Sequence, residues 1–443
     1  MRELPCRAGR VVALLALCGP ALGGSAAGQS VTLAEAVDAA LRSHPAVAAA
    51  AARVTAAEEA GDAARAAWLP GAAVSATLTR FEEPMVVAPF HSLDFSSPPS
   101  FDRTLVQSRL GLQYTLFDGG ERSARIRGAD AAHEATGFAL DGTEMEILET
   151  TVAAYVGVLS ARAVLEASAA QVAALGEEHA RASRALAAGT TAELEVLRAA
   201  ATLQEARAEE ASARARVGLA ERALDRLMGT DTEAISGRAL VDVGARATPA
   251  AQGDVGSSPL VMGAARAVAA AEARMAEERG GRFPILEAGA GLLDYGTIAG
   301  NHVFEWQAGL QLSWPLFTGG ARSAAVRRAA ADLAAAESDL EATRLRVAQA
   351  IDAAQTSVVE AAARAEALEL AVTQWEEVAR IEALALAAGS GVQRDLLRAQ
   401  AGLFQARAGH AAARYDVIVA LARLARAEGT LDRVWLTESL ETR

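Results

Sequence analysis

Lysine is absent from this chain, cysteine is nearly absent, and aromatic side chains are scarce. All 42 basic residues are arginines, and aromatic residues make up only 4% of the 443 residues. The two cysteines, Cys6 and Cys18, both lie near the N-terminus. Removal of that segment would leave a chain with no disulfide and no thiolate nucleophile. The formal net charge of -13 disfavours a nucleic-acid partner.

Residues 1–27 have the pattern of a secretory signal peptide. Arginines precede a short apolar run at residues 11–17, and small residues at 25–27 offer a cleavage site. A buried N-terminal strand or helix is the alternative. No later apolar run approaches the roughly 20 residues of a transmembrane helix. An exported chain without such a helix is either soluble or a membrane β-barrel.

The second half of the chain repeats the first. Residues 112–120 match residues 312–320 at an offset of about 200, and the dipeptide at 44–45 matches that at 258–259 at an offset of about 214. A change in loop length within residues 82–103 accounts for the difference. The pattern indicates an internal tandem duplication. Each half has the order helix, strand, loop, strand, very long helix, turn and helix.

This repeat divides the chain into segments. We expect a signal peptide at 1–27, a first structural repeat at 28–229, a connector at 230–258, a second repeat at 259–429 and a C-terminal tail at 430–443. The connector is rich in Gly, Ala, Ser and Pro, which is typical of an irregular segment. It contains one short predicted strand at residues 239–243.

Four segments alternate between apolar and polar residues, which predicts β-strands with one apolar face and one polar face. They are residues 71–81, 104–117, 285–296 and 303–317. An antiparallel sheet on a soluble core is one interpretation. Each strand is, however, long enough to cross a bilayer at a tilt. Arg109 and Glu305 on the polar face suit a wet lumen, while Trp306 and Trp314 suit an interfacial aromatic girdle.

Four strands cannot close a membrane barrel, because known single-chain barrels begin at about eight strands. Open sheet edges in lipid would leave unsatisfied backbone groups, each of which costs several kcal/mol. Other copies of the chain must therefore complete the barrel, and three copies would give about 12 strands. Residues 82–103 and 297–302, which join the strands away from the helices, are then expected to be external loops.

Two proline-free runs, residues 119–187 and 319–387, predict helices of about 100 Å. Helices of this length imply a coiled-coil-like assembly. Asp118 and Thr318 precede them as candidate N-caps, and Asp118 with Glu121 resembles a capping box. Two shorter helices should lie end to end beside each long one. These are residues 45–67 and 191–228 in the first half, and 259–281 and 391–428 in the second.

The strand–helix junctions and the helical tips together resemble the TolC-like outer membrane factor family, the outer membrane efflux proteins. The resemblance is carried by the junctions at 116–120 and 315–320, the tips at 188–197 and 388–397, and the opening segment at 32–45. It covers essentially the whole mature chain. It implies an α+β membrane protein: a homotrimer whose 12-stranded outer-membrane barrel, with four strands per chain, continues as a long α-helical barrel across the periplasm.

The resemblance also implies a function and partners. The chain would be the exit duct of a tripartite efflux or type I secretion system, set in outer-membrane lipid and extending into the periplasm. It would receive substrates from an inner-membrane pump of the RND, ABC or MFS type. A periplasmic adaptor (a membrane fusion protein) would join the two. An equatorial region would form from the connector and the two chain ends.

Candidate site residues follow from the same resemblance. Acidic residues six positions after the tip glycines are expected at the periplasmic constriction. In some members of the family, an aromatic residue before the second tip glycine and an arginine after it help to lock the closed tip. Here those positions hold Leu386 and Gly391, and nearby arginines are expected to replace them. The constriction set is Glu195, Asp395, Arg394 and Arg398. The adaptor-contacting turns are Gly189, Thr190, Gly389 and Ser390, and the strand–helix junction residues are Gly119, Gly120, Gly319 and Gly320.

The sequence shows no pattern that indicates enzymatic chemistry. The six histidines are scattered without metal-ligand spacing. The glycines at 289, 291 and 296 do not open a helix, as those of a dinucleotide loop would. We therefore expect no catalytic, cofactor or metal site. The alternative function is a soluble periplasmic coiled-coil adaptor protein, whose lipoyl-like or β-barrel domain is not visible in this sequence.

Overall fold

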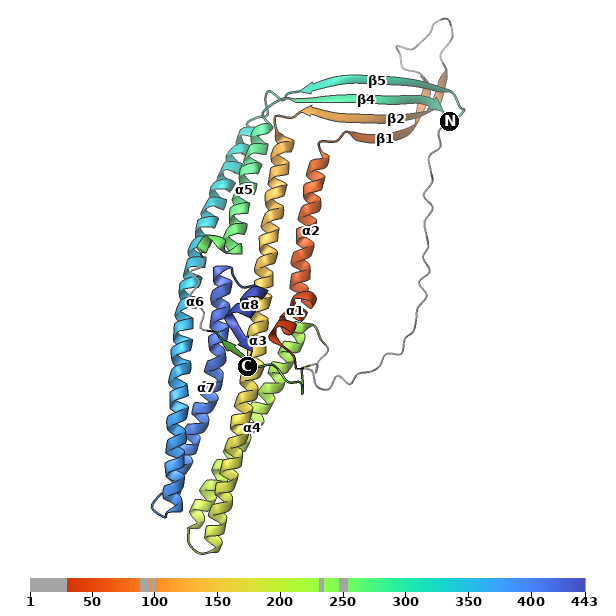
Figure 1. Cartoon of the computed structure of the whole chain (residues 1–443). Coiled ribbons are helices and arrows are strands. Elements are labelled where there is room, and N and C mark those ends of the chain that lie inside the picture. The colour runs from red at the N-terminus through yellow and green to blue at the C-terminus, as the bar shows by residue number, and fades with distance from the viewer. Residues whose placement is uncertain (1–29, 88–95, 97–99, 231–234, 247–253, 443) are drawn as a thin grey trace, which may run out of the picture.

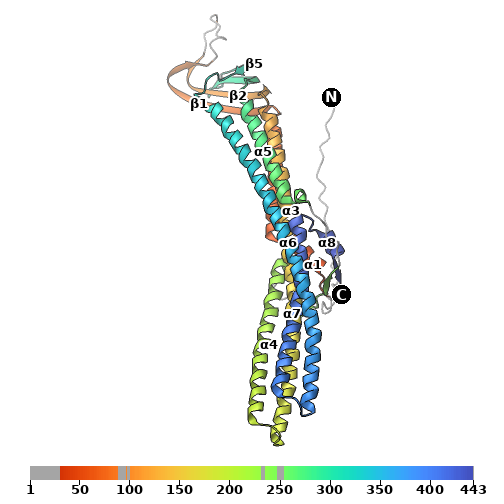
Figure 2. The same cartoon turned by 90° about the vertical axis from the view of Figure 1, so that its left-hand side faces the viewer.

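The computed structural model describes residues 30–87, 96, 100–230, 235–246 and 254–442. Within them, a four-stranded sheet lies at one end of a long helical body, and two helical hairpins end together at the opposite end (Figure 1). Short elements from both ends of the chain gather midway along the body (Figure 2). The predicted signal peptide and the central part of the predicted loop at 82–103 lie outside the described residues.

Helices make up the body, and their bounds lie within two residues of those predicted for the long and paired helices. Both α3 and α6 contain 67 residues, which corresponds to about 100 Å. The helices are α1 (Leu33–Ser43), α2 (Pro45–Ala66), α3 (Glu121–Ala187), α4 (Glu193–Met228), α5 (Pro259–Gly280), α6 (Ala321–Ala387), α7 (Gln393–Glu428) and α8 (Arg433–Ser439), with a 3-10 turn at Val255–Ser257.

Each long helix has two shorter helices beside it. Helices α2 and α4 pack along α3, helices α5 and α7 pack along α6, and α3 also contacts α5 and α7. Small side chains line these contacts, since Ala199, Ala206 and Ala213 of α4 are all buried at seven-residue spacing. The equivalent alanines of α7 are buried too. Alanine at a heptad spacing lets helix axes approach closely and leaves no thick core.

The N-caps of the two long helices, α3 and α6, differ from those predicted from the sequence. Helix α1 begins with a capping box between Thr32 and Glu35, and proline occupies the first position of α2 and of α5. Asp118 and Thr318 are not the N-caps of the long helices. Left-handed glycines hold those positions, at Gly120 and Gly320. The carboxylate of Asp118 instead accepts hydrogen bonds from the amides of Gly120 and Arg122, at 3.1 Å each.

The sheet is antiparallel, with the strand order β1-β2-β4-β5. Its strands are β1 (Gly71–Val86), β2 (Phe101–Phe117), β4 (Ile285–Thr297) and β5 (His302–Ser313). The last strand ends four residues earlier than predicted, because Pro315 has no amide to donate. The first strand runs five residues further, with a register shift between Arg80 and Met85. Pro84 is tolerated there because β1 is an edge strand.

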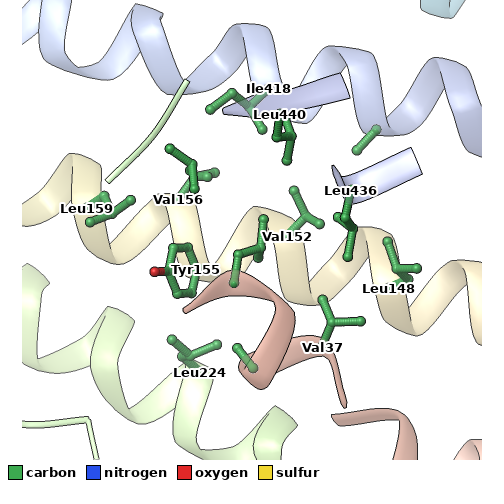
Figure 3. Packing of buried hydrophobic residues seen from close by; sticks show 14 of the residues in the cluster. Val37, Leu148, Val152, Tyr155, Val156, Leu159, Leu224, Ile418, Leu436 and Leu440 are labelled. Carbon is green, nitrogen blue, oxygen red and sulfur yellow. The ribbon is translucent and has the colours of Figure 1, made fainter. Parts of the chain in front are cut away.

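The apolar core of the molecule lies midway along the helices. The middle of α3 packs there against α1, the upper ends of α4 and α7, and a two-stranded sheet of β3 (Val243–Ala245) and β6 (Leu440–Thr442) (Figure 3). The connector strand predicted at 239–243 is thus displaced: of these residues, Val243 begins β3 and Leu240 forms an isolated bridge to Val31. By length and composition α3 could cross a membrane, but its apolar middle packs into this core.

A buried tyrosine joins the N-terminal segment to the connector in this core. The hydroxyl of Tyr155 lies 2.8 Å from the carbonyl oxygens of both Val31 and Val241. Burial raises the pKa of this hydroxyl well above its ordinary value, so it remains protonated and donates. The hydrogen bond holds the two segments against α3, and it explains why these short elements pack at this level.

Candidate functional site

The two faces of the four-stranded sheet differ in chemistry. The strand registers align Val74, Leu110, Leu292 and Trp306 in one row across all four strands. These side chains are 77%, 44%, 56% and 74% exposed. A row of large exposed apolar side chains is not stable in water, so this face requires an apolar environment.

The opposite face of the sheet is polar and hollowed. A hollow of about 640 Å³ lies against this part of the sheet. The charged and amide side chains that line it come from three strands, and they are Arg109, Gln113, Glu287, Gln307 and Gln311. A sheet that is apolar outside and polar inside has the pattern of a membrane barrel wall around an aqueous lumen.

The junction between sheet and helices is held by a buried ion pair. Arg122 Nε lies 2.6 Å from Asp118 Oδ2, and the guanidinium lies 4.2 Å from the centre of the Trp68 ring. Burial alone would raise the pKa of Asp118, but hydrogen bonds from Arg122 and from the Gly120 amide hold it below its ordinary value. This contact fixes the end of α2 to the start of α3.

All four predicted junction glycines are required by their conformation, and Gly119 also by space. Gly119 and Gly120 have φ angles of 67° and 91°, in the left-handed region. A Cβ on Gly119 would lie 2.5 Å from the carbonyl oxygen of Gly280 and 2.7 Å from Phe283 Cβ. Gly319 and Gly320 have the same left-handed backbone, but a Cβ there would meet nothing within 4 Å.

The predicted tip turns have the geometry of Schellman motifs. Gly189 and Gly389 have φ angles of 76° and 75°. The amides of Thr190 and Ser390 donate to the carbonyl oxygens of Ala185 and Ala385, as this motif requires. The hydroxyls of Thr190 and Ser390 donate to the same two carbonyls, at 3.0 and 3.2 Å. These two side chains therefore close their own turns.

The acidic residues predicted at the constriction lie just inside the return helices. Glu195 is the third residue of α4, and Asp395 is the third residue of α7. Acidic groups in this position also stabilise the helix dipole. Glu195 Oε1 accepts from Arg198 at 2.7 Å, and Asp395 Oδ1 lies 3.4 Å from Arg394 Nε. Arg398 lies exposed one turn beyond Arg394.

The tips hold two features that the sequence analysis missed. The Oε2 atom of Glu195 is buried and has no hydrogen-bond partner among the described residues. Leu397 of α7 packs against a cluster formed by Leu175, Leu203 and Ala206 of the other hairpin. Leu397 therefore joins the two hairpins near their tips. The apolar spacing of α7 gave no signal for this contact, because many equivalent leucines of the long helices are exposed.

The profile of the outer membrane efflux proteins matches residues 36–230 and again residues 255–430. The chain belongs to the outer membrane efflux protein family. Proteins of this family are channels of the outer membrane that extend into the periplasm, and they are not enzymes. The family resemblance seen in the sequence is thereby confirmed.

Individual relatives agree with this assignment. The alkaline protease secretion protein AprF of Pseudomonas aeruginosa is 28% identical over 353 residues, covering 76% of this chain and 72% of AprF. The outer membrane efflux protein BepC of Brucella suis is 26% identical over 357 residues, covering 79% of this chain and 77% of BepC. The fold is that of the outer membrane protein VceC of Vibrio cholerae, with a TM-score of 0.76, 20% identity, and coverage of 90% of this chain and 97% of VceC.

The tip turns lead to a prediction. Replacing Gly189 or Gly389 with valine places a β-branched residue in left-handed backbone, which costs about 1–2 kcal/mol. Limited proteolysis at the tips should then be about 5–30-fold faster, since local opening becomes that much easier. Gly176→Val is the matched control, because Gly176 lies within α3, the helix that ends just before Gly189, without positive φ and with open space around it. Equal cleavage rates in all variants would contradict the turn geometry.

Proposed function

We propose that this protein is the exit duct of a tripartite efflux or type I secretion system. It would carry substrates from an inner-membrane pump across the periplasm and the outer membrane. The observation that carries the proposal is the sheet with an apolar outer face and a polar inner face, joined directly to helices of about 100 Å. A soluble adaptor, the alternative, would have no use for such an apolar sheet face, and the family assignment does not support it.

The proposed assembly is a homotrimer with a 12-stranded barrel. Strands β1 and β5 are the two edges of the sheet, so one side of each lacks a strand partner among the described residues. Each unpaired backbone group would cost several kcal/mol in lipid. Three copies give about 12 strands, which lies within the range of closed membrane barrels.

Regions other than the barrel have proposed roles as well. Residues 28–229 and 259–429 are the two structural repeats, joined by the connector at 230–258. The connector and the tail at 430–443 form the equatorial region, and this is supported by the pairing of β3 with β6. Residues 1–27 are the signal peptide.

The tips are the proposed contact with a periplasmic adaptor, which would link the duct to a pump of the RND, ABC or MFS type. They lie at the end of the body opposite the sheet (Figure 1). Leu194, Leu197 and Val392 are exposed there, close to the turns at Gly189 and Gly389. Exposed apolar side chains of this kind favour a protein partner. The name of AprF refers to protease secretion and that of BepC to efflux, so both kinds of cargo system are represented among the relatives.

The first experiment tests the assembly and the cargo route together. Native mass measurement of the detergent-solubilised protein should give three chains, and the protein should fractionate with the outer membrane. Deletion of the gene should abolish export by the system that the chain serves, and expression of the intact chain should restore it. A stable monomer in detergent would contradict the proposed duct.

The second experiment tests the constriction. In a trimer, threefold symmetry would bring three copies each of Glu195 and Asp395 towards one axis, where like charges repel and attract cations. The double change Glu195→Gln with Asp395→Asn should reduce cation preference in planar-bilayer conductance and weaken block by multivalent cations. Glu205→Gln with Glu209→Gln, higher on α4, removes the same charge and should leave selectivity unchanged. Equal selectivity in parent and tip variant would place the constriction elsewhere.

A further inference from the structure

The two halves of the structure correspond residue for residue at fixed offsets. Helices α3 and α6 differ by 200 at both ends, and α4 and α7 do the same. Helices α2 and α5 differ by 214 at both ends. The strand register obeys these offsets too, because Gly71 pairs with Gln113 and Ile285 pairs with Ser313. From Gly71 to Arg80, the β1–β2 hairpin therefore maps onto the β4–β5 hairpin without a slip of even one residue.

One contact has no counterpart within the chain. The first half meets the second through the β2–β4 ladder and through the contacts of α3 with α5 and α7. The offsets map β2 onto β5, β4 onto β1, α3 onto α6 and α5 onto α2. The counterpart of this contact therefore joins β5 and α6 to β1 and α2, and these lie at opposite edges of the same sheet. Only a second copy of the chain can supply it.

We propose that the seam between copies repeats the β2–β4 ladder, so that Leu310 of one copy pairs with Leu78 of the next. The proposal rests on the homotrimer proposed above and fixes its register. Leu110 pairs with Leu292 inside the chain, and the offsets convert this pair into Leu310 and Leu78. The same conversion sets the neighbouring pairs along the seam as far as the register shift after Arg80.

From Ser75 to Leu78, the side chains paired in this register match in polarity, whereas further from the helices they do not, since Trp306 would meet Glu82. On the apolar face Leu310 meets Leu78, and Leu312 meets Ala76. On the polar face the mapped pairs are Gln311 with Thr77 and Ser313 with Ser75. A shift of one residue would move the apolar set of one strand to the polar face of the sheet, so the pattern strongly specifies this alignment.

The helices beside the seam agree with the same alignment. Inside the chain, a Cβ on Gly119 would clash with Gly280 and Phe283. A Cβ on its counterpart Gly319 would meet nothing within 4 Å. The offsets place Ala66 and Leu69 of the next copy in this empty space. Both residues are exposed in the single chain, Leu69 at 69%.

The charges along the two contacts differ, although the geometry is shared. Between α3 and α5, Arg125 pairs with Glu277 at 2.9 Å and Arg266 pairs with Glu134 at 2.7 Å. All four counterparts at the seam are alanines, namely Ala325, Ala63, Ala52 and Ala334. The seam is therefore closed there by small apolar side chains rather than by ion pairs.

One ion pair between copies takes their place. Inside the chain, a Cβ on Gly128 would lie 3.4 Å from Ala273 Cβ, so these two positions face each other. Their counterparts are Arg328 and Glu59, both exposed in the single chain, where Arg328 also lies 3.6 Å from Glu278. The register thus sets an arginine of one copy opposite a glutamate of the next, and this complementarity is an independent point in its favour.

Cysteine pairs test the register directly. In full-length protein with Cys6 and Cys18 changed to serine, Leu78→Cys with Leu310→Cys should, on oxidation in the outer membrane, shift the denatured band from one chain to two and three chains. Paired positions lie about 4.5–5.5 Å apart, within disulfide reach. Leu110→Cys with Leu292→Cys, the parent pair inside the chain, should cross-link without any shift in chain number.

Shifted pairs on the same face serve as matched controls. Leu310→Cys with Ala76→Cys or with Arg80→Cys places the sulfurs on diagonal neighbours about 7–8 Å apart, and these pairs should stay one chain in size. Preferred cross-linking of either shifted pair would overturn the register and leave the trimer intact. A trimeric mass with no cross-link in any of the three pairs that contain Leu310→Cys would overturn the pairing of β5 with β1. A monomeric mass would overturn the homotrimer and the register together.

Discussion

A backbone amide or carbonyl that faces hydrocarbon without a hydrogen-bond partner costs several kcal/mol, and this cost organises the whole molecule. The sheet of this chain presents such groups along both β1 and β5. Its outer face cannot avoid lipid, because its rows of exposed leucine, tryptophan and phenylalanine are unsuited to water. In the proposed assembly the chain is therefore an incomplete wall, which other copies of the chain complete.

The helical body follows from the same incompleteness. A wall around a lumen cannot have a thick core, and alanine fills the contacts between helices at heptad spacing. The large apolar side chains are concentrated instead in one cluster midway along α3, where both chain ends and the connector meet. That cluster is larger than the other buried apolar clusters of the described residues. The sheet and the tips project from it in opposite directions (Figure 2).

Much of this architecture could be predicted from the sequence, because periodicity decides the type of each element. Alternation at every second residue predicted the strands, and the proline-free runs predicted α3 and α6 with ends correct to two residues. The family was predicted as well, and it is confirmed. Strand ends were less accurate, since Pro84 sits inside an edge strand that tolerates it while Pro315 lies beyond the last strand.

Side-chain contacts between distant segments could not be predicted, because they depend on packing rather than on local pattern. The stacking of Arg122 on Trp68 joins residues 54 positions apart, and no spacing rule indicates it. Asp118 was predicted as a helix cap, but a left-handed glycine took that position and left the carboxylate to bind Arg122. The constriction residues were predicted by resemblance, and within one chain Glu195 and Asp395 each pair with an arginine of their own helix.

The central claim is that neither edge of the sheet remains open in the membrane. Hydrogen–deuterium exchange of the detergent-solubilised protein measures this directly, strand by strand. If copies of the chain close the barrel, the amides of β1 and β5 will exchange as slowly as those of β2 and β4. Fast exchange confined to β1 and β5, with slow exchange in the two central strands, would show open edges and contradict the account.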